Sequence, residues 1–236
     1  MENVTDRTSN PFGMRPSCEA FVPGYGDANA EFHVVGDHPG VHGGAATGTS
    51  PDGGSATVAT ARSDDDSAPE SALRVPFTNE AGLRLQRALV EGGLLASAGP
   101  RPEVNRTFLS YLHMCVPDDG ETPEERDYVE MERFFDAELR AIAAHVLLPV
   151  GERATRHVLA NYTADDATGP LDMTALHGTE ILGSGFLVYP IRDPGEWEEG
   201  DHDRLVGALH DLQSTDFHRE VDLGRFLPGD DDWRVR

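Results

Sequence analysis

Two short segments of the sequence combine residue types that could bind and hydrolyse a ligand. The turn Gly36–Gly40 (GDHPG) directly follows the apolar run Phe32–Val35, and it contains a carboxylate, Asp37. Glycine and proline favour a tight turn there, and open α/β sheets bind their ligands at the carboxyl ends of strands. The second segment, Pro76-Phe77, precedes a predicted helix. An acid and an aromatic ring are therefore expected at one edge of a sheet.

The elements that must position these residues follow from hydrophobic periodicity. Strands are predicted at 32–35, 107–113, 145–150 and 186–191, and helices at 83–95, 122–144, 151–160 and 203–213. The helix at 122–144 opens with Thr122-Pro123-Glu124-Glu125, where proline and acids suit a first turn. Alternation of strands with helices predicts a parallel sheet covered by helices on both faces.

These motifs, in this order, resemble those of the uracil-DNA glycosylase superfamily. Three further stretches extend the resemblance: Leu112–Pro117 (LHMCVP), the TPEE helix start at Thr122, and Leu148–Ala154 (LPVGERA). The branch with a G-E-x-P-G turn and an iron–sulfur cluster is the most similar, with Asp37 in the acidic position. The resemblance implies a three-layer α/β/α fold with a four-stranded parallel sheet of order 2-1-3-4.

The resemblance also implies roles for the two segments. Asp37 would position the attacking water or stabilise a cationic sugar, since glycosidic cleavage passes through an oxocarbenium-like state. Phe77 would stack on a flipped base. His38, with Pro39 and Gly40, would lie against the base or a phosphate. From the residues alone, Asp37 as a turn cap, Phe77 as a core ring and His38 as a surface histidine remain open.

The sequence departs from the superfamily pattern at two substrate-contacting positions. Asp193 stands where the distal motif has the histidine that stabilises the departing uracil anion, and Arg192 is the cation expected to substitute for it. Tyr111 stands where the superfamily has the asparagine that reads the edge of uracil, and tyrosine is too large for that role in the usual pocket.

No cofactor is expected. The sequence contains two cysteines, Cys18 and Cys115, in two of the four places that hold the cluster in the iron–sulfur branch, and two thiolates cannot hold a four-cysteine cluster. Two cysteines also suggest no disulfide framework. A metal site at His33, His38 and His42 is not expected, because no carboxylate–histidine spacing recurs. The glycine-rich stretch after Gly40 lacks lysine and cannot be a Walker-type phosphate loop.

The composition predicts a protein adapted to high salt. The 19 basic residues are all arginine, and against 42 acidic residues they leave a net charge of −23. At 1 M salt the Debye length is about 3 Å, so such charge is heavily screened. A bias from high-GC codons would explain the missing lysine but explains the charge less well. Charge therefore neither supports nor excludes DNA as a partner, because cationic contacts dominate such binding only at lower salt.

We expect one domain over residues 1–236. Residues 43–72 have the composition of a flexible acidic insertion rich in Gly, Ser and Ala, and 219–236 that of an acidic C-terminal tail. Neither a membrane-spanning stretch nor a secretory pattern is evident, so a cytoplasmic location is expected. The protein is also expected to be a monomer.

The expected function is excision of uracil or another damaged base from single- or double-stranded DNA. The alternatives are a superfamily member that binds nucleic acid or nucleotide without catalysis, and a hydrolase of small nucleoside-like molecules. Asp37 with Phe77 favours catalysis, whereas Asp193, Tyr111 and the missing cysteines favour binding alone.

Overall fold

The structure of the chain is a computed structural model that describes residues 13, 15–44, 74–118, 121–164 and 169–217. One mixed sheet of six strands lies at its centre, in the order β1-β3-β2-β4-β6-β5. The strands are β1 (Tyr25–Gly26), β2 (Phe32–Gly36), β3 (Thr107–Tyr111), β4 (Val146–Pro149), β5 (Ile181–Leu182) and β6 (Leu187–Val188). The helices are α1 (Pro39–His42), α2 (Glu80–Glu91), α3 (Glu125–Ile142), α4 (Gly151–Tyr162), α5 (Met173–Leu176), the 3-10 helix η3 (Pro194–Glu196) and α6 (Asp201–Ser214).

The prediction of a four-stranded, wholly parallel sheet is wrong. The four predicted strand segments form β2, β3, β4 and β6, which are neighbours and run parallel, but β1 and β5 add an antiparallel strand at each edge. Each edge strand has only two residues and thus no hydrophobic alternation to predict it. The observed architecture is a mixed α/β fold with a mostly parallel sheet.

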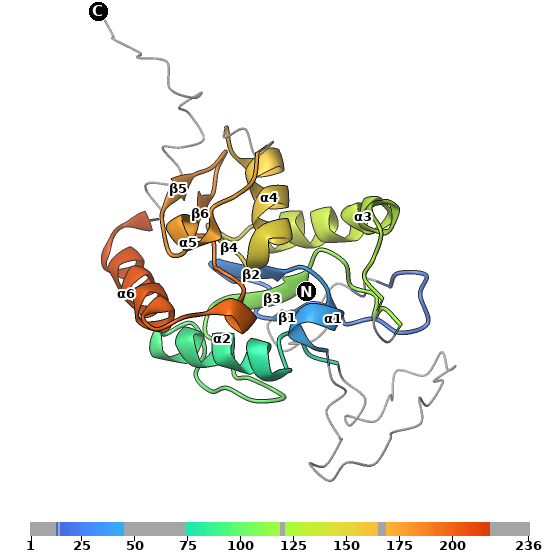
Figure 1. The fold of residues 1–236 in the computed structure, drawn as a ribbon, viewed down its shortest axis with the longest axis horizontal. Coiled ribbons are helices and arrows are strands. Elements are labelled where there is room, and N and C mark those ends of the chain that lie inside the picture. The colour runs from blue at the N-terminus through green and yellow to red at the C-terminus, as the bar shows by residue number, and fades with distance from the viewer. Residues whose placement is uncertain (1–12, 14, 45–73, 119–120, 165–168, 218–236) are drawn as a thin grey trace, which may run out of the picture.

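Helices cover both faces of this sheet (Figure 1). Alternate residues of β2 explain this, because successive side chains of a strand point to opposite faces. Phe32 and Val34 pack with residues of α2 and α6, whereas Val35 packs with residues of α3 and α4. Both faces are therefore buried, and the strands read as continuous apolar runs as expected for parallel sheets.

The helix predicted from Thr122 begins three residues later, at Glu125. Thr122 precedes a proline, and the residue before proline is disfavoured in helical conformation. The backbone N–H of Glu124 instead donates to Asp127 Oδ2 over 2.8 Å, which closes the helix N-terminus. This start directs the first turn of α3, including Tyr128, toward the turn after β2.

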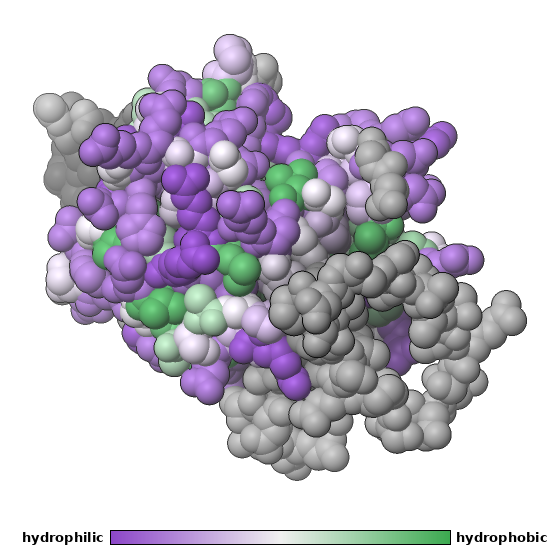
Figure 2. All heavy atoms as spheres, turned by 60° about the horizontal axis from the view of Figure 1, so that its bottom comes forward, coloured by the Kyte–Doolittle hydropathy of each residue, from purple (hydrophilic) through white to green (hydrophobic). Residues whose placement is uncertain are grey.

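The described surface seen in Figure 2 is mainly hydrophilic, with apolar side chains in small separate groups. Among the described residues, no helix combines the length and hydrophobicity needed to cross a bilayer. Of the predicted insertion at 43–72 only Gly43 and Gly44 are described, and the predicted tail at 219–236 lies outside the described residues.

Candidate functional site

The candidate site lies where the parallel strands end. Because β2, β3, β4 and β6 run in the same direction, the residues that follow them meet at one edge of the sheet. The pairing of β2 with β3 continues past the strand ends: Leu112 N–H donates to Gly36 O over 2.9 Å, and His113 N–H to Asp37 O over 3.0 Å. These bonds fix the backbone of Asp37 beside the loop that follows β3.

The predicted turn after β2 leads into the short helix α1. His38 caps this helix, since its Nδ1 accepts from Gly40 N–H over 3.1 Å, and Pro39 occupies the first turn. Gly40 is required by close packing: a Cβ there would lie 2.8 Å from His38 Cε1 and 3.0 Å from Pro117 Cγ. Pro39 and Gly40 therefore shape the turn, and no substrate contact is needed to explain them.

Asp37 is held by two side chains from the helices after β3 and β4. Its Oδ1 accepts a short hydrogen bond from the hydroxyl of Tyr128, and its Oδ2 lies 3.9 Å from Arg153 Nε. The Arg153 guanidinium covers the Tyr128 ring at 4.3 Å and also donates to Glu125 Oε2 over 2.9 Å. Burial raises the pKa of Tyr128, and the bond to Asp37 raises it further, so the phenol remains a donor at neutral pH. The Asp37 side chain keeps 19% of its surface exposed, so solvent can reach it.

Two histidines complete this polar side, which we call the Asp37 cluster: Asp37, His38, His113, Tyr128 and Arg153. Burial lowers the pKa of His38, and Asp37 only partly opposes this change. Burial lowers the pKa of His113 too, although its hydrogen bond to Cys115 O opposes the change. The His113 ring lies 5.5 Å from that of Tyr128. The two imidazoles are thus mainly neutral near pH 7, and Asp37 and Arg153 are the charged members.

On the other side of the turn, Phe77 is part of the core. Its side chain is fully buried, with its ring 5.1 Å from that of Tyr111 and 5.5 Å from that of His42. Its N–H donates to the Tyr111 hydroxyl over 2.7 Å, and that hydroxyl donates to Gly43 O. A ligand could therefore stack on Phe77 only if Tyr111 or His42 moved. We call Phe77, Tyr111 and His42 the aromatic stack.

Two features of the backbone accompany the aromatic stack: a glycine in the strand beneath it and a left-handed conformation at Phe77. A Cβ on Gly36 would lie 2.7 Å from Tyr111 Cε1 and 2.8 Å from Phe77 Cζ, so only glycine fits beneath the rings. Phe77 itself has a φ of 60°, a left-handed conformation that is costly for a residue with a side chain. Gln86 Nε2 holds it there by donating to Phe77 O over 2.7 Å.

The structure directs Arg192 away from Asp37. Its guanidinium forms ion pairs with Asp201 at 3.0 Å and with Glu198 at 3.3 Å. These contacts join the loop after β6 to α6, so the expected catalytic cation is engaged in a structural network. Arg192 is therefore not part of the Asp37 cluster.

Asp193, in contrast, reaches the aromatic stack. Its Oδ2 lies 3.4 Å from His42 Nε2, within ion-pair distance, while neither ring nitrogen of His42 has a hydrogen-bond partner among the described residues. Burial favours the neutral form of Asp193, but His42 and the Gly195 N–H outweigh burial and hold the pKa of Asp193 below its usual value. A carboxylate–imidazole pair thus stands beside Phe77.

Sequence reasoning missed Tyr128, Arg153 and the contact of His42 with Asp193. A usable signal was present for the first two, since both lie in the first turn of a helix that follows a parallel strand. Such turns face the carboxyl edge of the sheet, so their polar residues are candidates for the site. The His42–Asp193 contact joins residues too distant in the chain for any local pattern to indicate.

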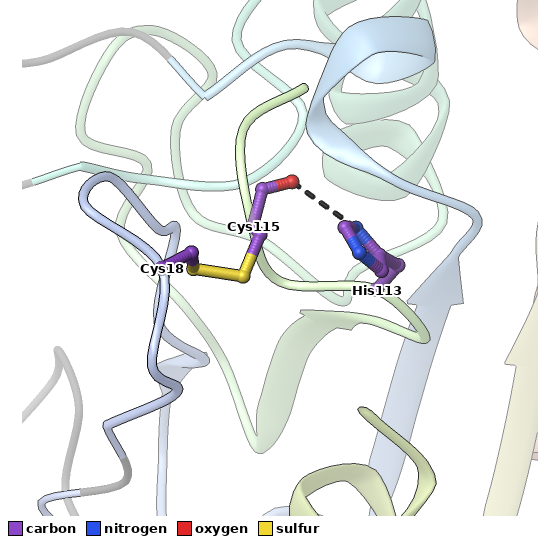
Figure 3. The surroundings of a disulfide bond; sticks show 3 residues. All are labelled: Cys18, His113 and Cys115. Carbon is purple, nitrogen blue, oxygen red and sulfur yellow. Dashed lines mark hydrogen bonds between the residues drawn. A yellow bond between two sulfur atoms is a disulfide. The ribbon is translucent and has the colours of Figure 1, made fainter. Parts of the chain in front are cut away.

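No disulfide framework was expected from two cysteines, but Cys18 and Cys115 form a single disulfide (Figure 3). Their Cα atoms are 6.0 Å apart. Their separation of 97 residues gives no hint of pairing. The antiparallel contact between Phe21 and Cys115 brings the two chain segments together. In this state neither sulfur is a free thiolate.

The described residues contain no group of three or more His, Cys, Asp or Glu side chains arranged to hold a metal ion. A hollow of about 400 Å³ lies at the opposite, amino edge of the sheet, where its lining includes Asp136, Arg140, Tyr162 and Phe186. It is separate from the Asp37 cluster.

The Asp37 cluster offers a partly exposed carboxylate with fixed orientation, flanked by one cation and two neutral imidazoles. Such a group can stabilise a developing cation or accept a proton from water. No protein-family model matches the chain, and no curated protein is significantly similar to it.

Proposed function

We propose that the chain is a member of the uracil-DNA glycosylase superfamily that hydrolyses the N-glycosidic bond of uracil or another damaged base in DNA. The observation that supports this most is the fixed position of Asp37 at the carboxyl end of the central strand β2. Neighbouring parallel strands on both sides of β2 make this edge the expected ligand site of an open sheet.

In the proposed reaction, the bond between C1′ and the base nitrogen breaks and its electron pair leaves with the base. The sugar becomes an oxocarbenium-like cation, which a nearby carboxylate stabilises. Water then adds to C1′ and loses a proton to Asp37. The Tyr128 hydroxyl orients the carboxylate, and the Arg153 guanidinium lies beside it.

A second function is favoured by the aromatic stack. Phe77 is fully buried, and the Tyr111 hydroxyl already occupies the Phe77 N–H. A protein with this packing would bind nucleic acid or a nucleotide without placing a flipped base on Phe77. The second proposal is therefore a non-catalytic member of the same superfamily.

One assay distinguishes the two proposals. Purified protein in multimolar KCl is incubated with uracil- and hypoxanthine-containing single- and double-stranded DNA, followed by alkali to reveal abasic sites. Alkali-sensitive breaks with the parent and with the control Asp211→Asn, but not with Asp37→Asn, support hydrolysis. Asp211 is an exposed residue of α6. Binding without breaks supports the second proposal, and neither binding nor breaks rejects both.

A further inference from the structure

The disulfide joins the N-terminal segment of the described chain to the loop after β3. Besides the covalent bond, backbone pairing joins the two segments: Val22 N–H donates to Met114 O over 2.8 Å, and Val116 N–H donates to Ala20 O over 2.9 Å. Phe21 and Cys115 form an isolated antiparallel bridge between these two bonds. The disulfide thus adds a covalent link to this backbone-paired contact.

The same loop forms one side of the Asp37 cluster. His113 donates its backbone N–H to Asp37 O, and its ring lies against Tyr128, the donor to the Asp37 carboxylate. The His113 Nδ1 is 3.2 Å from Cys115 O, and Figure 3 draws this contact as a dashed line. Met114 alone therefore separates the disulfide-bonded Cys115 from His113, the residue that contacts both Asp37 and Tyr128.

A second contact links this loop to the turn on the other side of Asp37. Pro117 packs against Gly40 so closely that a Cβ on Gly40 would lie 3.0 Å from Pro117 Cγ. A shift of residues 113–117 would thus disturb the packing of α1 as well as the contact with Tyr128. The loop has no helix or strand of its own to keep it in place.

The two sulfurs differ in access. Cys115 keeps 8% of its surface exposed, whereas Cys18 is half-buried in a segment at the surface. Exchange between thiols and disulfides requires a thiolate to reach one of the two sulfurs. Cys18 is the more exposed of the two residues, so we take its sulfur as the one that an external thiolate attacks.

We propose that Cys18–Cys115 is a thiol–disulfide exchange site for dithiol reductants and that its reduction loosens one side of the Asp37 cluster. A thiolate of the reductant attacks Cys18 Sγ, the S–S bond breaks, and Cys115 leaves as a thiolate that takes up a proton. The second thiol of the reductant then displaces Cys18 and forms the disulfide of the reductant. Two electrons and two protons thereby pass to the protein. This inference does not depend on the proposed function.

Amide hydrogen exchange, followed by mass spectrometry of the full chain in multimolar KCl, tests this proposal. Air-oxidised protein is compared with protein reduced by dithiothreitol. We expect no free thiol in the oxidised protein, because the two cysteines of the sequence are joined to each other in the disulfide. After reduction, peptides that cover residues 112–118 and Tyr128 should exchange several-fold faster, while those from α6 should not change.

Two variants control the experiment. Cys18→Ser should show the fast exchange without reductant, and Cys18→Ser/Cys115→Ser should show it with no response to dithiothreitol. The proposal is overturned if the isolated protein contains free thiols, or if faster exchange is confined to residues 15–22. A uniform increase over the whole chain would also overturn it, because the disulfide would then support the entire fold.

Discussion

The two sides of the turn between Gly36 and Gly43 differ in kind. The Asp37 cluster is polar and partly exposed, and side chains from two helices, α3 and α4, hold its carboxylate. The aromatic stack is fully buried and held by ring packing and by one hydroxyl that bridges two backbone groups. Two motifs that the sequence suggested to be one functional unit are thus separate in the structure: one is polar and partly exposed, and the other is packed into the core.

Substitution of Phe77 should have the largest effect, and on stability. Because the ring is fully buried, Phe77→Ala should lower the free energy of unfolding by about 3–5 kcal/mol, the usual loss for a core phenylalanine. Denaturant titration followed by circular dichroism in high salt measures this. A loss below 1 kcal/mol, with weaker DNA binding, would instead make Phe77 a ligand-stacking residue and remove the contrast between the two sides.

Substitution of Asp37 should affect chemistry instead. Asp37→Asn keeps the hydrogen-bonding shape but removes the charge, so cleavage should slow by about a hundredfold or more. Rates under single-turnover conditions measure the change, with unfolding curves recorded in parallel. Cleavage at the parent rate would reduce Asp37 to a structural residue of the turn.

Tyr128→Phe tests whether cleavage requires the hydrogen bond that orients the Asp37 carboxylate. Loss of one hydrogen bond to a charged group, worth about 1.5 kcal/mol, should slow cleavage about tenfold. Tyr162→Phe is a matched control, since it removes a similar bond from the Tyr162 hydroxyl to Asp136 Oδ1, 2.8 Å long and away from the site. If both variants cleaved DNA equally slowly, the loss would reflect a general effect of removing a partly buried hydroxyl and not the orientation of Asp37.

Glu138 should make the stability of the protein depend on pH. It is buried beside Gly24 and Ser110, and Ser110 Oγ lies 2.8 Å from His33 Nε2. Burial raises the pKa of Glu138 to about 8 from the ordinary 4.5. The folded state therefore binds more protons than the unfolded state between these values, so this residue lowers stability as pH rises from 4.5 to about 8.

Glu138→Gln should remove that dependence. We expect almost no change in the free energy of unfolding near pH 4.5 and a relative stabilisation of the variant that grows toward pH 8. Urea titrations at several pH values measure the slope. A variant whose stability changes with pH as steeply as that of the parent would show that another group is responsible.

The sequence predicted the elements that have strong local patterns. Phe32–Val35 and the helix from Gly151 are within two residues of their observed bounds, because an apolar run and an amphipathic period are local properties. The two-residue strands β1 and β5 have no such pattern. The sequence indicated Asp37 as a candidate because it lies in a glycine-containing turn directly after a predicted strand. Tyr128 lies 91 residues from Asp37, and their contact depends on how α3 packs.

The disulfide also changes the covalent topology of the chain. It closes a ring whose ends are 97 residues apart and which includes β1, β2, α1, α2 and β3. The segment 45–73 lies inside this ring by sequence. A single peptide-bond break anywhere between Cys18 and Cys115 would thus leave one covalent molecule, and Asp37 would stay joined to the rest of the sheet. Reduction of the disulfide would then divide the cleaved chain into two covalently separate pieces, so the covalent consequence of a single break in the ring depends on whether thiols are present.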